Sequence, residues 1–194
     1  MFRIRKGRGV VAMSYVFVLG GARSGKSHFA EQWAKKTAQE SGQDVVYLAT
    51  GQALDDEMQT RIEKHQAERP ATWMTQEVPC EVATWLVEQR EARIVILDCL
   101  SLLVSNWLFY EEANEARLQE RTLQLVQALQ ETKHHVVVVS NEVGQGIVPG
   151  DELSRRYRDA LGILNQQVAQ RADAVYVVFA GMAVDVKKLR EVLP

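Results

Sequence analysis

Residues 20–27, GGARSGKS, are the part of the chain whose residue types and spacing point most directly to chemistry. They match G-x-x-x-x-G-K-[ST], they follow an apolar run, and they precede a segment with helical periodicity. Gly20 and Gly25 allow successive backbone N–H groups to point at phosphate oxygens, and the helix beginning near Lys26 adds its positive end. Lys26 is expected to reach the β and γ phosphates. The segment predicts a nucleoside triphosphate site.

A second candidate group for this site is Asp98, which ends the apolar run IVILD at 94–98. A carboxylate at the end of a strand, together with the hydroxyl of a P-loop serine, is a common Mg²⁺ site in nucleotide-binding proteins. We therefore expect Ser27 and Asp98 to be ligands of Mg²⁺ or Mn²⁺. The alternative is that Asp98 only caps the segment that follows it.

The segment from Thr50 to Pro70 carries a histidine that could act as a nucleophile. Met58, Ile62 and His65 follow i, i+4, i+7 spacing and so share one face of a predicted helix that ends before Arg69-Pro70. A neutral imidazole, with an ordinary pKa of about 6.5, can attack phosphorus and pass the group on. A histidine on an otherwise apolar face is also commonly structural, and the pattern alone leaves both interpretations open.

Five short apolar runs must form the elements that position these residues. Each is almost continuously hydrophobic, as in parallel strands buried on both faces, and helical segments lie between them. The pattern predicts a three-layer α/β fold with a mostly parallel sheet and helices on both faces, built from βαβ units. The expected strands are 15–20, 45–50, 94–98, 136–140 and 174–181. The expected helical segments are 27–40, 118–129 and 151–171, the last with Asp151 as its cap and Leu153 in its apolar stripe.

The amino-acid composition restricts the classes of function that the chain can have. The chain has 194 residues, 46% hydrophobic residues and a formal charge of −2, which fits one globular domain and gives no sign of a nucleic-acid-binding face. No apolar run is long enough to cross a membrane. Cys80 and Cys99 are expected to be reduced thiols. Residues 1–13 are basic and are expected to be a disordered extension, with 14–194 forming the catalytic domain.

Taken together, the motifs resemble those of the bifunctional adenosylcobinamide kinase/adenosylcobinamide-phosphate guanylyltransferase family. The resemblance is carried by the phosphate loop, YLATGQALDDEM, the R-I-x-x-H-x-x-x-R-P run at 61–70, NEVGQGIVP at 141–149 and RDALGILNQQVA at 158–169 with FAG downstream. It implies a RecA-like P-loop protein that phosphorylates adenosylcobinamide with ATP or GTP. Such a protein would then transfer GMP from GTP to the phosphorylated product and release pyrophosphate.

The resemblance also implies roles for individual residues. His65 would carry the guanylyl intermediate, Lys26 would assist catalysis, and Glu77 would bind the guanine N1–H and amino group. Asn141 and Glu142 could face cobinamide or another subunit. The nucleotide-binding residues implied are Gly20, Gly21, Ala22, Arg23, Ser24, Gly25, Lys26, Ser27, Thr50, Gly51, Gln52, Gln66, Ala67, Glu68, Arg69, Glu77 and Asp98.

The family further implies a cytoplasmic homotrimer whose partners are adenosylcobinamide and nucleotides. Two other functions fit the phosphate loop. One is a small-molecule kinase in which His65 is structural, which would release no pyrophosphate. The other is a RecA-type nucleotide-dependent switch, which would hydrolyse nucleotide in response to a macromolecular partner; the acidic composition counts against a DNA-binding protein of that kind.

Overall fold

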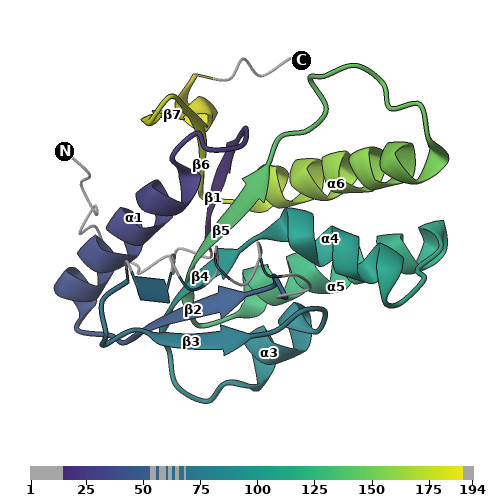
Figure 1. Cartoon of the computed structure of the whole chain (residues 1–194). Helices are drawn as coiled ribbons and strands as arrows, with labels where there is room; N and C mark the ends of the chain where they lie inside the picture. Colours follow the sequence, from purple (N-terminus) through teal and green to yellow (C-terminus); the bar gives the residue numbers. More distant parts are fainter. Residues whose placement is uncertain are drawn as a thin grey trace.

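The computed structural model describes residues 15–52, 56, 60, 63, 66–67 and 69–189. A seven-stranded sheet with strand order β3-β2-β4-β5-β1-β6-β7 forms the centre of the molecule, and every neighbouring pair is parallel except β6 and β7. Figure 1 shows the arrangement. The strands are β1 (Tyr15–Gly20), β2 (Val45–Ala49), β3 (Met74–Glu77), β4 (Ile94–Asp98), β5 (His135–Asn141), β6 (Ala174–Phe179) and β7 (Met182–Asp185).

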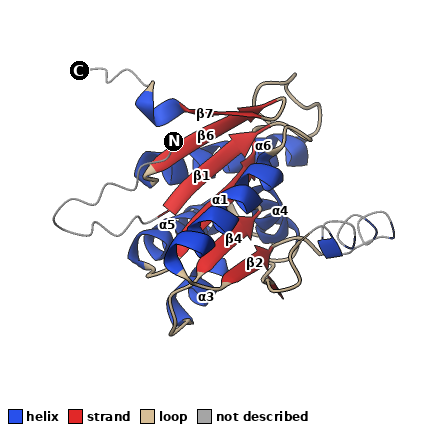
Figure 2. Ribbon diagram, turned by 90° about the vertical axis from the view of Figure 1, so that its left-hand side faces the viewer, coloured by secondary structure: helices blue, strands red, loops and turns tan. Residues whose placement is uncertain are grey.

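Helices cover both faces of the sheet, so the three-layer prediction is confirmed (Figures 1 and 2). One face packs against α1. The other face packs against four helices that share a single apolar core with it. The helices are α1 (Lys26–Ser41), α3 (Val82–Glu88), α4 (Leu100–Phe109), α5 (Glu115–Glu131) and α6 (Glu152–Arg171), with a short 3₁₀ turn at Val186–Lys188.

The central strands are continuously apolar because successive side chains enter different cores. Phe17 packs on the α3–α6 side, whereas its neighbours Val16 and Val18 pack on the α1 side. Asp151 caps α6 as predicted, accepting a hydrogen bond from the Ser154 backbone N–H at 2.8 Å. Leu153, by contrast, is predicted in the buried stripe of this helix and is 41% exposed, because the buried part of α6 begins only at Leu161.

The C-terminal part of the sheet differs from the prediction. The expected strand at 174–181 ends at Phe179, and β7 returns antiparallel along the edge of the sheet, visible beside β6 in Figure 2. The turn has left-handed backbone at Ala180 (φ 48°) and Gly181 (φ 81°), which reverses the chain although the sequence stays apolar. The short elements β3 and α3 were not predicted.

Three further expectations from the sequence concern the two cysteines, membrane-spanning helices and residues 1–13. Cys80 and Cys99 are both free cysteines. Across the part of the chain that the structure describes, no helix has the length and apolar character needed to cross a membrane. Residues 1–13, expected to be a disordered extension, lie outside the described residues.

His134, just before β5, is a buried titratable group away from the phosphate loop. It is 1% exposed, its Nδ1 accepts the Arg93 backbone N–H at 3.0 Å, and its ring lies 5.7 Å from the Trp85 ring. Burial, reinforced by the charges of Lys133, Arg93 and His135, lowers the pKa of His134 to about 4. The folded protein therefore holds this imidazole neutral.

This lowered pKa predicts acid sensitivity of the fold. Between pH of about 6.5 and about 4 the unfolded chain binds a proton that folded His134 does not, so the free energy of unfolding falls as pH falls, by at most about 3 kcal/mol. Urea unfolding of His134→Gln across this range should show a shallower pH dependence than wild type. His28→Gln, at an exposed position of α1, is the matched control and should keep the wild-type slope. Equal slopes for wild type and His134→Gln would contradict the assignment.

Candidate nucleotide site

The phosphate loop joins β1 to α1 and is packed against the turn between β6 and β7. The Gly181 backbone N–H donates to the Ser24 carbonyl at 2.8 Å, and Gly25 adopts a φ of 101° that favours glycine. At Gly20 the packing is tighter still, because a Cβ there would lie 2.5 Å from the Val178 carbonyl oxygen. The loop is therefore held in shape from behind by backbone groups of the neighbouring hairpin.

Lys26, the first residue of α1, is held against the beginning of the loop. The side chain is 8% exposed and Nζ donates to the Gly21 carbonyl at 2.5 Å. The lysine predicted to contact phosphates therefore lies at the Gly21 side of the loop. The helix N-terminus beneath it supplies unpaired N–H groups, which favour an anion at this position.

Ser27 and Asp98, the two predicted metal ligands, are brought together from α1 and the end of β4. Ser27 Oγ donates to Asp98 Oδ2 at 3.0 Å, and the Tyr47 hydroxyl from β2 donates to the same oxygen. Burial and the adjacent Asp98 carboxylate raise the pKa of Tyr47 well above its usual value, so the phenol stays protonated as a donor. Tyr47 thus fixes the orientation of the carboxylate.

Tyr47 also contacts the end of the histidine-bearing segment. The Arg69 guanidinium carbon lies 3.3 Å from the centre of the Tyr47 ring, and Nη1 donates to Thr75 Oγ1 at 3.5 Å. Arg69 Nε is buried and has no hydrogen-bond partner among the described residues. A chain of contacts from Arg69 through Tyr47 and Asp98 to Ser27 therefore links this segment to the phosphate loop.

Thr50 follows β2 and ties it to β4. Its hydroxyl donates to the Cys99 carbonyl at 2.8 Å and accepts the Cys99 N–H at 2.9 Å, while Asn106 Nδ2 donates to the Thr50 carbonyl at 2.8 Å. Thr50 is fully buried. These bonds fix the backbone that leads into Gly51 and Gln52 at the carboxyl edge of the sheet.

The remaining predicted residues lie along the same edge or outside the described part of the chain. Glu77 is the exposed last residue of β3 and is paired with Ala49. Gln66 and Ala67 are exposed, whereas His65 and Glu68 lie outside the described residues. In the described part of the chain no cluster of three or more His, Cys, Asp or Glu side chains is arranged to hold a metal ion.

Sequence reasoning missed Tyr47 as a member of the site. The one available signal is its hydroxyl, the sole polar side-chain group in the run VVYLA at 45–49. A buried phenol requires a hydrogen-bond partner, and parallel strands end at a common edge, so a carboxylate such as Asp98 was a reasonable partner to seek. The Arg69 contact has no comparable signal, because the two residues meet only through the tertiary fold.

These features define a P-loop nucleotide-binding protein. The sheet is mostly parallel, a glycine-rich loop follows β1, and a helix begins at the lysine of that loop. The serine of the loop is hydrogen-bonded to an aspartate at the end of a strand. The solved structure of an ATPase domain agrees with this architecture, with a TM-score of 0.52 at 14% sequence identity over 86% of this chain and 69% of that chain. At that identity the similarity shows the fold alone.

Sequence comparisons give the particular family. The model of the CobU family, cobinamide kinase / cobinamide phosphate guanyltransferase, matches residues 16–186, and the chain belongs to this family. The bifunctional adenosylcobalamin biosynthesis protein CobP of Pseudomonas aeruginosa is 44% identical over 171 residues, covering 88% of this chain and 95% of that protein. CobU of Salmonella typhimurium is 38% identical over 184 residues, covering 89% and 99%.

The packing behind the loop predicts that two adjacent glycines differ in how well they tolerate an added Cβ atom. In Gly20→Ala the added Cβ would meet backbone at Val178, and such overpacking typically costs about 1–3 kcal/mol. In Gly21→Ala, the matched control, the added Cβ would meet nothing within 4 Å. Chemical denaturation should therefore show a loss of stability in Gly20→Ala and little change in Gly21→Ala. Equal stability of the two variants would contradict the described loop packing.

Proposed function

We propose that the kinase and guanylyltransferase reactions of this family are carried out here at one nucleotide site, by the phosphate loop and by His65. As a member of the family the protein is an adenosylcobinamide kinase and adenosylcobinamide-phosphate guanylyltransferase of adenosylcobalamin biosynthesis. The observation that supports a shared site best is the chain of contacts from Ser27 to Arg69, which places the end of the histidine segment beside the phosphate loop.

In the kinase step, the loop amides and Lys26 bind the triphosphate and stabilise negative charge that develops as the γ-phosphoryl group leaves. Backbone donors fixed by the β6–β7 turn need little reorganisation during the reaction, which is what makes such a site effective. The geometry at Lys26 and Gly21 supports this assignment.

The proposed metal ligands fit Mg²⁺ or Mn²⁺. Ser27 Oγ and Asp98 Oδ2 are hard oxygen donors 3.0 Å apart, and such ions are usually bound by one or two protein oxygens together with phosphates and water. When bound, the ion would neutralise charge on the β and γ phosphates. Tyr47 would hold the Asp98 carboxylate in position for it.

In the guanylyl transfer, His65 attacks the α-phosphate of GTP. A P–N bond forms, the bond from the α-phosphorus to the bridging oxygen breaks, and pyrophosphate leaves. The phosphate of adenosylcobinamide phosphate then displaces the histidine and yields adenosylcobinamide-GDP. The motif R-I-x-x-H-x-x-x-R-P and the anchored Arg69 support His65. The position of Glu77 at the end of β3, at the same sheet edge, supports its role in binding the guanine.

Covalent labelling tests the nucleophile. Incubation with GTP labelled at the α-phosphate should leave acid-labile, base-stable label on wild type and none on His65→Ala, because a phosphoramidate requires this nitrogen. Lys64→Ala is the matched control, since a neighbouring lysine would give a bond of similar lability. Label on His65→Ala together with its loss from Lys64→Ala would move the nucleophile to Lys64 and contradict the assignment.

Removal of one hydroxyl tests the role of Tyr47. Tyr47→Phe keeps the ring under Arg69 but loses the hydrogen bond to Asp98, and loss of such a supporting bond typically lowers metal affinity about 10–100-fold. We expect Mg²⁺-dependent binding of a fluorescent GTP analogue to need a higher Mg²⁺ concentration, with binding in excess chelator unchanged. Tyr176→Phe, on β6, controls for loss of a tyrosine hydroxyl. An unchanged Mg²⁺ dependence would remove Tyr47 from this role.

We also propose that the protein works as a homotrimer in the cytoplasm. Exposed apolar side chains at the free sheet edge, Met182 and Val184 on β7, support an interface between copies of the chain. Free Cys80 and Cys99 are compatible with a reducing compartment.

A further inference from the structure

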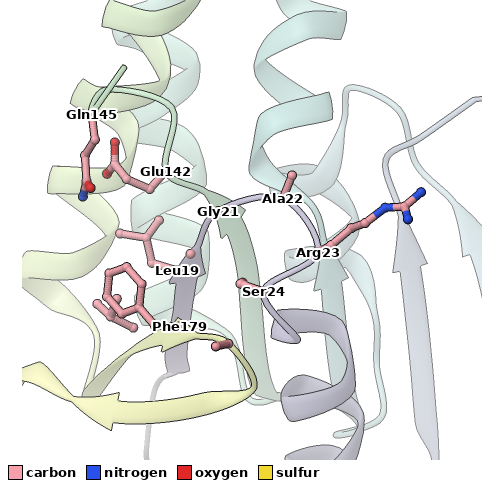
Figure 3. A pocket seen from close by; sticks show the side chains of 11 residues that line it. Leu19, Gly21, Ala22, Arg23, Ser24, Glu142, Gln145 and Phe179 are labelled. Carbon is pink, nitrogen blue, oxygen red and sulfur yellow. The ribbon is translucent and has the colours of Figure 1, made fainter. Parts of the chain in front are cut away.

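A cavity of about 450 Å³ lies beside the phosphate loop, on the face of the sheet opposite to α1. It is lined by the loop residues 20–24, the segment after β5 and the turn after β6, as Figure 3 shows. Leu19 and Phe179 give it an apolar side, and Glu142 and Gln145 give it a polar side. None of the nucleotide contacts implied by the sequence motifs uses these four side chains.

The P-loop motif indicates that the cavity would border the γ-phosphate end of a bound nucleotide rather than its base. Lys26 Nζ lies 2.5 Å from the Gly21 carbonyl, and the P-loop lysine contacts the β and γ phosphates, so the terminal phosphates lie toward the beginning of the loop. Gly20 and Gly21 at that beginning also line the cavity. A molecule in the cavity would therefore approach the group that the kinase step transfers.

Glu142 is held at the boundary between cavity and loop. Its backbone N–H donates to the Gly20 carbonyl at 3.1 Å, which extends the β1–β5 pairing by one residue. Its Oε1 accepts the Gly144 N–H at 2.7 Å, which fixes the half-buried carboxylate. In Figure 3 the Glu142 side chain extends from the end of β5 to lie beside Gln145 and across the hollow from Phe179, whereas the Arg23 side chain points away.

We propose that this cavity binds the alcohol arm of the kinase acceptor, with Glu142 as the catalytic residue that accepts the hydroxyl proton. This inference rests on the proposed function. The acceptor oxygen forms a bond to the γ-phosphorus, the bond from that phosphorus to the bridging oxygen breaks, and the nucleoside diphosphate leaves. The hydroxyl proton passes to the Glu142 carboxylate and from there to water.

The apolar side of the cavity fits the rest of such an acceptor. Adenosylcobinamide joins its alcohol arm to a large ring system with apolar faces, and Phe179, which is 59% exposed, offers a ring for contact. Ile147 and Val148, 96% and 60% exposed, add apolar side chains to the segment after β5, two and three residues beyond Gln145. The whole acceptor exceeds the cavity, so the arm and one edge of the ring would enter it.

Separate assays of the two half-reactions test Glu142. We expect Glu142→Gln to lower kcat of the kinase step by about 100-fold or more, in the range usual for loss of a general base. Covalent labelling of the protein by GTP, which needs no acceptor, should stay within threefold of wild type. Glu152→Gln, in the exposed first turn of α6, is the matched control and should leave both unchanged.

The possible results separate the inference from the proposed function. Kinase activity of Glu142→Gln within threefold of wild type would overturn the inference. An equal loss of kinase activity and of labelling would also overturn it, because the cavity would then serve the nucleotide. Absence of labelling in wild type would instead contradict the guanylyl-histidine mechanism and leave the kinase assay as the test of Glu142.

A second pair of variants tests the cavity without touching Glu142. Phe179→Ala should raise KM for adenosylcobinamide about 10-fold, in keeping with loss of one buried aromatic contact, while KM for the nucleotide changes less than twofold. Phe109→Ala removes a phenylalanine of similar exposure at the end of α4, outside the cavity, and should change neither constant. A rise in the nucleotide KM alone, or no change in either KM, would overturn the assignment.

Discussion

One carboxylate oxygen holds the nucleotide site together. Asp98 Oδ2 accepts hydrogen bonds from Ser27 on α1 and Tyr47 on β2, so groups from two neighbouring strands and from the helix on the phosphate loop converge on it. The Tyr47 hydroxyl can reach this oxygen because the register of β2 and β4 pairs Ala49 with Asp98. The chemistry of the site therefore depends on correct pairing of β2 and β4 as much as on the loop itself.

The phosphate loop is supported from its other side by the hairpin of β6 and β7. Gly181 donates to Ser24, and the Val178 carbonyl leaves room for hydrogen alone at Gly20. These are backbone contacts, so they impose a fixed loop shape largely independent of neighbouring side chains. The same hairpin presents Phe179 to the adjacent cavity, which means that one turn both shapes the nucleotide site and borders the space next to it.

The sequence was informative wherever one physical effect dominated. The strands β1, β2, β4 and β5 are continuously apolar because both faces are covered, and this single cause made them predictable. The end of β6 was not predictable from the sequence, since Phe179 and the residues after it remain apolar while the chain reverses at Ala180 and Gly181. The phosphate loop and Asp98 were found from local motifs, whereas the contacts of Tyr47 with Asp98 and Arg69 join strands and loops distant in sequence.

The anchored arginine also bears on how one protein could perform two transfers. Arg69 stacks on the tyrosine that orients Asp98, and His65 precedes it by four residues. Because four residues of chain span at most about 14 Å, an anchored Arg69 limits how far a nucleophile at 65 can be from the phosphate loop. In the proposed function, the substrate alcohol would attack the γ-phosphorus of a bound triphosphate and His65 would attack its α-phosphorus. The two transfers would then need a change of attacking group and not a second nucleotide site.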